Sequence, residues 1–498
     1  MENEDILNSG IEPNNDLKDL MKELTALKNE NDALKTDVNR LETWPEKETL
    51  EHRNTQLKAK LAAMESRLGE RDDLDPPSAV YVPALCEGLR YQFKKGNKID
   101  ADYVPAFADS QRFKKGYGFS WWTEDSPFYY PRILVSAYYG MKDSHFYRDE
   151  LQIGKEVLFM GDSGGFQIAS VRKKGGNLKG LTPMNVLEWL KTNCDIGLAL
   201  DIPPTLSGAQ PTDQEYQWAK KTLVEHNNIY ERHRDDLMVY NVLHGETDER
   251  MNDWYETVKD TSFEGWAVGL KPSSHPILQA RGLGFMAQKG HTENIHVLGA
   301  SGFDVIPLFA HASKTIDNLT YDSSSYNRGV IERQYVTPMN MRFKMHFGTK
   351  DDNQNARVRN TRLNSMPCNC PVCVSTPPEK MFEEGSWAGS ILSMHNLYWY
   401  LYYADTMKIM ANANNQDTFR NYVSASCKDT AVLSMDIYDA LLANDDAEYD
   451  RLMLQASLGA QNKAKETSKK DKKLKKKDEE EAQMVALDIT TPGWDELF

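Results

Sequence analysis

Seven short apolar segments recur through the middle of this 498-residue chain, each ended by Gly, Asp or Pro. We expect them to be strands, at residues 133–137, 157–160, 196–200, 237–242, 266–268, 295–298 and 319–321. The segments between them, such as 184–194, 215–232 and 303–312, carry apolar residues at helical spacing. A repeat of about 25 to 40 residues is that of a βα unit. With one further strand that is easy to overlook, the pattern predicts an α/β fold, a (β/α)8 TIM-like barrel, over residues 78–435.

Reactive side chains stand where these predicted strands end. Asp162, Asp201, His244 and Asp322 each end or directly follow a different strand. In a (β/α)8 barrel such positions meet at the C-terminal rim, where active sites are built. Two or three carboxylates in one pocket suit glycosyl transfer, with one as nucleophile and another as general acid and base. The alternative for each aspartate taken alone is a helix N-cap.

The turn Gly161–Gln167 adds groups that suit a planar ligand. Its two adjacent glycines would let such a ligand approach the backbone, and Phe166 could stack on it. A Gly-Gly turn alone is a weak signal, so this reading depends on the neighbouring acids.

Three of the six cysteines fall within six positions, and a histidine follows 22 residues after the last of them. This set of Cys368, Cys370, Cys373 and His395 gives three thiolates and an imidazole, the usual closed set for a structural Zn2+. We expect a zinc knuckle at residues 366–400 that holds structure and performs no chemistry. The alternative is three reduced cysteines without a metal.

The two ends of the chain differ from the centre. Leucines in a heptad pattern predict a helical coiled coil over residues 1–75 that makes a homodimer; the alternative is an amphipathic helix packed on its own domain. Residues 436–498 are expected to form a helix and a mobile, disordered tail rich in Lys and Glu. The final segment 494–498 weakly resembles the C-terminal pentapeptides that bind bacterial replication clamps, which suggests a clamp as a further partner.

Composition narrows the class of protein. Lys and Arg number 59 and Asp and Glu 74, a net charge of −15, so contacts with phosphates must be local. The candidates for such contacts are basic residues at 172–174, 179 and 342–362. No apolar run reaches the roughly 18 residues that a membrane helix needs, and the first residues do not resemble a signal peptide. A cytoplasmic location is therefore expected, that of the host if the protein is viral.

Several motifs in order resemble one family, the tRNA-guanine transglycosylases (queuine and archaeosine type) and their DNA-modifying relatives. The likeness covers roughly residues 130–405. It rests on the segments 162–167, 201–203, 242–245, 297–300 and 321–326, and on the Cys-x-Cys-x-x-Cys motif followed by 395–398.

The resemblance implies a double displacement on a nucleic acid. Asp322 matches the family nucleophile that attacks C1′, and Asp162 the acid and base that protonates the departing guanine. Asp201 would read the N–H edge of the base and Phe166 would stack on it. Gln167 and the backbone of Gly269 would complete the pocket. The free incoming partner would be a 7-deazaguanine base.

The chain also departs from the family. His244 stands where the family usually has Gln, and an imidazole could donate one hydrogen bond to a carbonyl but not reproduce both amide contacts. With the coiled coil, the clamp-like tip and only about 65 residues after the catalytic region, this favours the phage-type enzymes that exchange guanine in DNA. A tRNA enzyme of the same chemistry is the alternative. A further one is a catalytically inactive, dimeric nucleic-acid-binding subunit.

Overall fold

The computed structural model describes about three fifths of the chain. The described residues are 79–85, 120–124, 126, 128–142, 147–173, 181–205, 211–270, 275–331, 334–336, 342–344, 368, 370–376, 386–412 and 416–459. The predicted coiled coil, the charged tail after residue 459 and the clamp-like tip lie outside these ranges.

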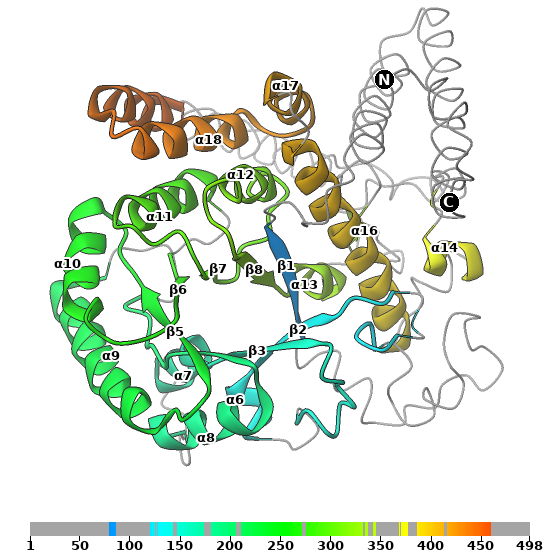
Figure 1. Cartoon of the computed structure of the whole chain (residues 1–498). Coiled ribbons are helices and arrows are strands. Elements are labelled where there is room, and N and C mark those ends of the chain that lie inside the picture. The colour runs from blue at the N-terminus through cyan, green and yellow to red at the C-terminus, as the bar shows by residue number, and fades with distance from the viewer. Residues whose placement is uncertain are drawn as a thin grey trace, which may run out of the picture.

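Eight parallel strands close into a barrel in their order along the chain, which confirms the predicted (β/α)8 TIM-like fold (Figure 1). The strands are β1 (Val80–Leu85), β2 (Arg132–Ser136), β3 (Leu158–Asp162), β4 (Ile196–Leu198), β5 (Met238–Leu243), β6 (Gly265–Val268), β7 (Ile295–Val297) and β8 (Leu319–Ser323). Seven of them match the predicted strands to within two residues at each end.

The strand that sequence periodicity overlooks is β1, which closes the barrel. Residues Val80–Pro83 pair with β8, and Ala84 and Leu85 pair with β2. Pro83 has no N–H to donate, and proline inside an apolar run argues against a central strand. Closure therefore shows only in the pairing of β1 with two strands that lie far from it in the sequence.

Helices surround the barrel and alternate with its strands (Figure 1). They are α6 (Ala137–Gly140), α7 (Gly165–Lys173), α8 (Pro183–Asn193), α9 (Asp213–His233), α10 (Asp248–Val258), α11 (Pro276–Gln288), α12 (Ile306–Ala312) and α13 (Ser325–Ile331). Local sequence sets where three of them begin. Thr182, Thr212 and Thr247 each accept a backbone N–H at a helix start, and Thr212 forms a capping box with Glu215.

Further elements pack on the outside of the barrel. They are the antiparallel pair β9 (Gln334–Val336) and β10 (Arg342–Lys344), then α14 (Pro371–Ser375), α16 (Ser386–Asn412), α17 (Gln416–Ser426) and α18 (Asp429–Leu442). In Figure 1 α16 runs beside β1 and α13, and α18 packs against α11 and α12. Residue 435, where the barrel region was expected to end, lies inside α18.

The inward side chains of neighbouring strands form layers. Leu134 pairs in register with Met160, and both pack with Val82 in a small core separate from the main one. Two residues further along, Ser136 pairs with Asp162. Because side chains alternate with a period of two, Ser136 and Asp162 point into the barrel above that small core.

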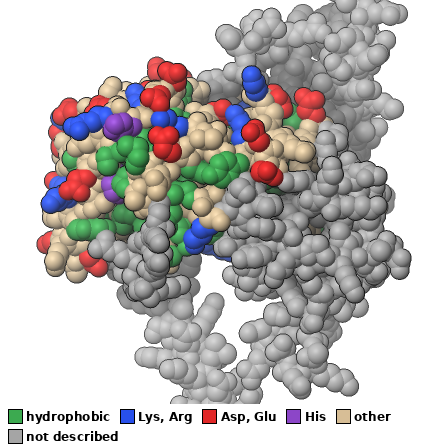
Figure 2. Space-filling model, turned by 90° about the horizontal axis from the view of Figure 1, so that it is seen from below, with side chains coloured by type: hydrophobic (Ala, Val, Ile, Leu, Met, Phe, Trp, Pro, Cys, Tyr) green, Lys and Arg blue, Asp and Glu red, His purple; other side chains and the backbone are tan. Residues whose placement is uncertain are grey.

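The surface carries both signs of charge. On the face in Figure 2, Lys and Arg side chains lie beside Asp and Glu, and hydrophobic side chains gather between them. None of the helices in the described ranges has the length and apolar character needed to cross a membrane.

Candidate active site at the barrel mouth

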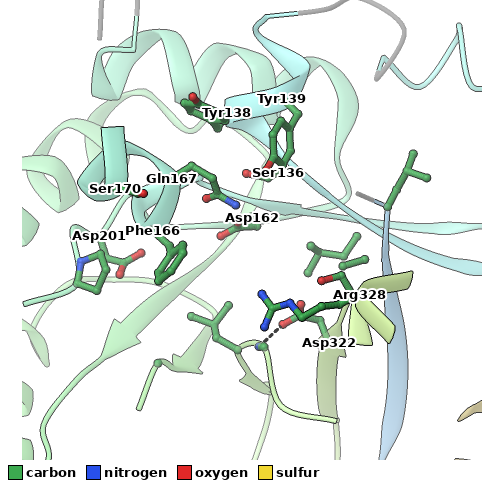
Figure 3. A pocket seen from close by; sticks show the side chains of 18 of the residues that line it. Ser136, Tyr138, Tyr139, Asp162, Phe166, Gln167, Ser170, Asp201, Asp322 and Arg328 are labelled. Carbon is green, nitrogen blue, oxygen red and sulfur yellow. Dashed lines mark hydrogen bonds between the residues drawn. The ribbon is translucent and has the colours of Figure 1, made fainter. Parts of the chain in front are cut away.

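A cavity of about 460 Å³ opens at the C-terminal ends of the strands. All seven non-metal site residues predicted from the sequence line it: Asp162, Phe166, Gln167, Asp201, His244, Gly269 and Asp322. In the view of Figure 3, Asp201 and Phe166 lie on one side, Asp322 and Arg328 on another, and Asp162 and Gln167 between them. The fold thus brings together groups that are up to 160 residues apart in the sequence.

Asp162 is the last residue of β3 and points into this cavity. Burial, and then the nearby carboxylates of Asp322 and Asp201, raise its pKa from 3.8 to about 7. Hydrogen bonds from Ser136 and the backbone of Gly164 oppose part of this rise. A carboxyl with a pKa near neutrality can both donate and accept a proton at physiological pH.

Asp322 is held differently, although it also lies at a strand end. The backbone N–H of Gly299 donates to its Oδ1 over 2.6 Å, the bond drawn in Figure 3. His296 Nε2 lies 3.3 Å from the same oxygen. The Gly299 N–H engages Oδ1, whereas the His296 contact lacks hydrogen-bond geometry, so Oδ2 is the oxygen better placed to react with a ligand. The carboxyl is 8% exposed and therefore has little water to screen it.

His296 is a residue that the sequence analysis missed. It lies on β7, is fully buried, and its Nδ1 is 2.9 Å from Thr320 Oγ1 on β8. A polar residue inside an apolar strand was the available signal. Its direction toward Asp322 depends on the register of β7 and β8, which the sequence does not state.

Asp201, His244 and Gly269 form a connected chain. His244 Nε2 lies 2.7 Å from Asp201 Oδ2, and His244 Nδ1 lies 2.9 Å from the carbonyl oxygen of Gly269. The N–H of Gly269 donates to Leu243 O. Direct contact of His244 or the Gly269 backbone with a base stays a prediction, and here their polar groups have protein partners.

The paired glycines after Asp162 serve the protein chain itself. Gly164 has a φ of +83°, a left-handed conformation that favours glycine. A Cβ on Gly165 would lie 1.7 Å from the carbonyl oxygen of Asp201. The space expected for a planar ligand beside Gly165 is therefore taken by the Asp201 backbone, and this glycine permits the close approach of two active-site loops.

Phe166 and Gln167 stand at the start of α7 and reach the same cavity. The Phe166 ring is 44% exposed, which is unusual for a large apolar side chain. The buried Oε1 of Gln167 has no hydrogen-bond partner among the residues that the structure describes. An exposed ring and an unpaired acceptor beside three carboxyls favour a flat ligand that carries N–H groups.

The cavity also contains residues that the sequence did not single out. Tyr138 and Tyr139 come from α6, and Arg328 from α13. Arg328 is exposed and lies six residues after Asp322, so it brings a cation to the edge of the cavity. The one sequence signal for these three residues is that each follows the C-terminal end of a strand.

The predicted metal ligands come together as a second site, outside the barrel. The ligand atoms of Cys368, Cys370, Cys373 and His395 all lie within 4.8 Å of one another, so the cluster could hold a metal ion. Cys370 and His395 are fully buried. His395 Nδ1 lies 3.2 Å from Cys370 Sγ and 3.3 Å from Cys373 Sγ. Three sulfurs around one imidazole nitrogen fit a tetrahedral ion.

Neighbouring groups orient these side chains through hydrogen bonds and stacking. His395 Nε2 lies 2.7 Å from Val336 O, an acceptor, so Nε2 carries the proton and the Nδ1 lone pair faces the thiols. The Trp399 indole N–H donates to Cys368 Sγ over 3.2 Å. The ring of Tyr335 stacks on His395 at 3.9 Å. Such partners orient a metal ligand before the ion binds.

Residues next to the cysteine–histidine cluster also bind the helix that follows the strand of Asp322. Asn396, next to His395 on α16, donates to the carbonyl oxygens of Tyr326 and Gln334 over 3.1 and 2.9 Å. Ser393 donates to Asn327 over 2.7 Å. Tyr326 and Asn327 belong to α13, which directly follows β8. The cluster therefore braces the segment that follows the candidate nucleophile.

Comparison of the sequence with models of known protein families and with curated proteins gives no match. Function is therefore argued from the geometry of the two sites. Of the basic residues expected to contact phosphates, 174, 179 and 345–362 lie outside the described ranges, as do the side chains of 172, 173, 342 and 344.

Proposed function

We propose that this protein is a base-exchange transglycosylase that replaces guanine in a nucleic acid with a 7-deazaguanine. The observation that carries the proposal is the convergence of three carboxyls, Asp162, Asp201 and Asp322, on one cavity in which the pKa of Asp162 is raised to about 7. Carboxyl groups with distinct environments are how one pocket provides a nucleophile and an acid–base residue.

Asp322 is the proposed nucleophile. Its Oδ2 forms a bond to C1′ of the target nucleotide while the bond from C1′ to N9 of guanine breaks. The N–H of Gly299 holds Oδ1, with His296 close behind it, and so fixes the direction of attack. The product is a covalent ester between enzyme and nucleic acid, which conserves the energy of the glycosidic bond for the second step.

Asp162 is the proposed acid and base. Protonated Asp162 gives its proton to the leaving guanine in the first step. The carboxylate then removes a proton from the incoming 7-deazaguanine, whose N9 attacks C1′ and releases Asp322. A pKa of about 7 populates both forms at neutral pH, as this alternation requires.

Base recognition falls to the remaining side chains of the cavity. The exposed Phe166 ring supplies a stacking surface, and Gln167 Oε1 an acceptor that has no partner among the described residues. Asp201, whose Oδ2 faces His244, would offer its Oδ1 as a second acceptor for the N–H edge of a guanine. The volume of about 460 Å³ is in the range of small-molecule sites. Because a base inside a duplex exposes neither C1′ nor this edge, the target nucleotide must leave its stack.

For the Cys368, Cys370, Cys373 and His395 cluster we propose a structural Zn2+. Three thiolates and an imidazole leave no open position, so the ion stabilises the fold and takes no part in the base exchange. Its role is to hold α16 against α13 near Asp322.

DNA is the nucleic acid we propose as substrate, because the chain departs from the tRNA enzymes at His244. The test is incorporation of labelled guanine or 7-cyano-7-deazaguanine by the zinc-loaded protein into duplex DNA and into bulk tRNA. Label in DNA alone supports the proposal. Label in tRNA alone assigns the same chemistry to tRNA, and label in neither favours the inactive binding subunit.

A further inference from the structure

The polar partners of His244 decide how this residue is protonated. Gly269 O can only accept a hydrogen bond, so His244 Nδ1 must be the donor across their 2.9 Å contact. The other ring nitrogen, Nε2, then faces Asp201 Oδ2 at 2.7 Å. A neutral ring with its proton on Nδ1 would place a lone pair against a carboxylate oxygen. The contact is a hydrogen bond only if one more proton lies between the two groups.

That proton belongs on Nε2, since an imidazole is a stronger base than a carboxylate. We propose that His244 is a positioning residue that carries this proton as an imidazolium, holds Asp201 in one orientation with Oδ1 free for the N–H edge of the base, and loosens base binding when the proton is lost. This inference rests on the proposed function for the identity of the ligand, and on geometry alone for the shared proton.

The surroundings favour a cation at this position. Asp162 and Asp322 line the same cavity as Asp201, so a positive ring reduces the repulsion among three acids. From α9, His226 binds Leu200 O through Nδ1 and the phenol of Tyr230 is buried nearby; burial lowers the pKa of His226 and raises that of Tyr230. These two groups therefore stay neutral near pH 7. Arg328, the cation at the edge of the cavity, lies beside Asp322 and away from Asp201 in Figure 3, so His244 is the group placed to offset the charge of Asp201.

The His244 ring is tightly packed. His244 is 4% exposed, and the indole of Trp254 contacts it edge to face with ring centres 4.9 Å apart. A Cβ on Gly269 would lie 2.7 Å from the ring carbon Cε1 of His244. The glycine at 269 is therefore explained by the imidazole that lies against it, and the whole unit serves to present Asp201.

Two variants separate the contacts of the ring. In His244→Gln the amide nitrogen can reach the position of Nε2 and donate to Asp201 without titrating. In His244→Asn the amide nitrogen matches Nδ1 and donates to Gly269 O, but does not reach Asp201. The measurement is equilibrium binding of radiolabelled guanine to the full-length, zinc-loaded protein between about pH 6 and pH 9.

We expect the affinity of the natural protein for guanine to fall as the pH rises, and that of His244→Gln to fall less. His244→Asn should bind about 10- to 100-fold more weakly than the natural protein at the low end of the pH range, because Asp201 loses its charged partner. This difference should narrow as the pH rises, because the natural protein then loses the same charge. Asp162 titrates in all three proteins, so the difference between their profiles reports on His244. Identical pH profiles for the natural protein and His244→Gln would overturn the proposal.

Nitrogen NMR of histidine-labelled protein without ligand separates this inference from the proposed function. The signal that disappears in His244→Gln identifies the residue. Two protonated ring nitrogens at pH 6 to 7 support the shared proton even if guanine does not bind, in which case the proposed function fails alone. A single neutral tautomer in that range rejects the imidazolium whatever the binding assay shows.

Discussion

The barrel mouth and the cysteine cluster have opposite effects on the stability of the fold. At the mouth, three carboxyls from different strands face one cavity, and their mutual repulsion helps to raise the pKa of Asp162 to about 7. At the cluster, three sulfurs and one imidazole surround a position where a cation would satisfy all four. Repulsion among the carboxyls at the mouth lowers the stability of the fold, whereas the cluster with its ion would raise it. Removing a carboxyl at the mouth should therefore maintain or raise the stability of the protein, whereas removing a cysteine of the cluster should lower it.

The largest effect is expected for the proposed nucleophile. Asp322→Asn removes the oxygen that forms the bond to C1′, so the covalent adduct on a denaturing gel and the incorporation of base should fall at least about 1,000-fold. Thermal stability should be unchanged or higher, because one of three like charges is gone. Asp260→Asn, at an exposed position after α10, is the matched control. An adduct that persists in Asp322→Asn would place the nucleophile elsewhere.

Asp162→Asn should lower turnover by about 100- to 10,000-fold, the usual range for a general acid and base. In the natural protein, guanine release should need protonated Asp162 and decline above about pH 7, while the second step needs the carboxylate and declines below it. The expected rate profile is a bell, to be measured as single-turnover release and incorporation against pH.

The same variant tests the stability argument. A raised pKa means that the folded state holds a proton between about pH 4 and pH 7 that the unfolded state has lost, so stability falls as the pH rises through that window. Asn does not titrate. Asp162→Asn should therefore gain stability over the natural protein on going from pH 5 to pH 8, on the order of 2 kcal/mol, in denaturant titrations. An equal difference at both pH values contradicts the raised pKa.

The cysteine cluster should respond in the other direction. Cys370→Ser removes a buried ligand, so bound zinc should fall from about one ion per chain to almost none by elemental analysis. Unfolding free energy should drop by several kcal/mol, less than the roughly 10–16 kcal/mol that zinc gives to isolated finger peptides, because the barrel keeps its own core. Cys427→Ser, away from the cluster, should keep its zinc. Full zinc content in Cys370→Ser would rule out this ligand set.

The smallest effect is expected for the stacking surface. Phe166→Leu keeps an apolar side chain but removes the flat ring, so guanine affinity should fall about 10-fold, within the roughly 1–3 kcal/mol that base stacking contributes. The melting temperature should not change, since this ring is 44% exposed. The control is Trp218, an exposed aromatic side chain on α9. Trp218→Leu should leave the affinity for guanine unaltered. A loss of stability without a loss of affinity would make Phe166 a packing residue.

Much of this structure could be predicted from local features of the sequence. The cysteine cluster was predictable because three of its ligands lie within six residues, where chain geometry alone brings their sulfurs close. The strand ends were predictable because apolar runs stop where a polar residue begins. Since parallel strands present their C-terminal ends on one side, Asp162, Asp201 and Asp322 could be expected to meet.

The contacts among these residues were not predictable. His244 and Asp201 are 43 positions apart, and their bond depends on two loops packing together across Gly165. His296 reaches Asp322 only because β7 and β8 pair in one register. The missed strand β1 has the same cause, since its proline hides a pairing that only closure of the barrel reveals.

By itself, then, the sequence determined the order of strands and helices, the acids at the strand ends and the four candidate metal ligands. Hydrophobic periodicity and short-range spacing are properties of neighbouring residues, and the chain states them directly. Only the tertiary structure decided which oxygens of Asp201 and Asp322 have protein partners, which histidine lies behind each carboxyl and how far the pKa of Asp162 rises. Those properties depend on distances of a few ångströms between distant segments, where burial and charge act most strongly.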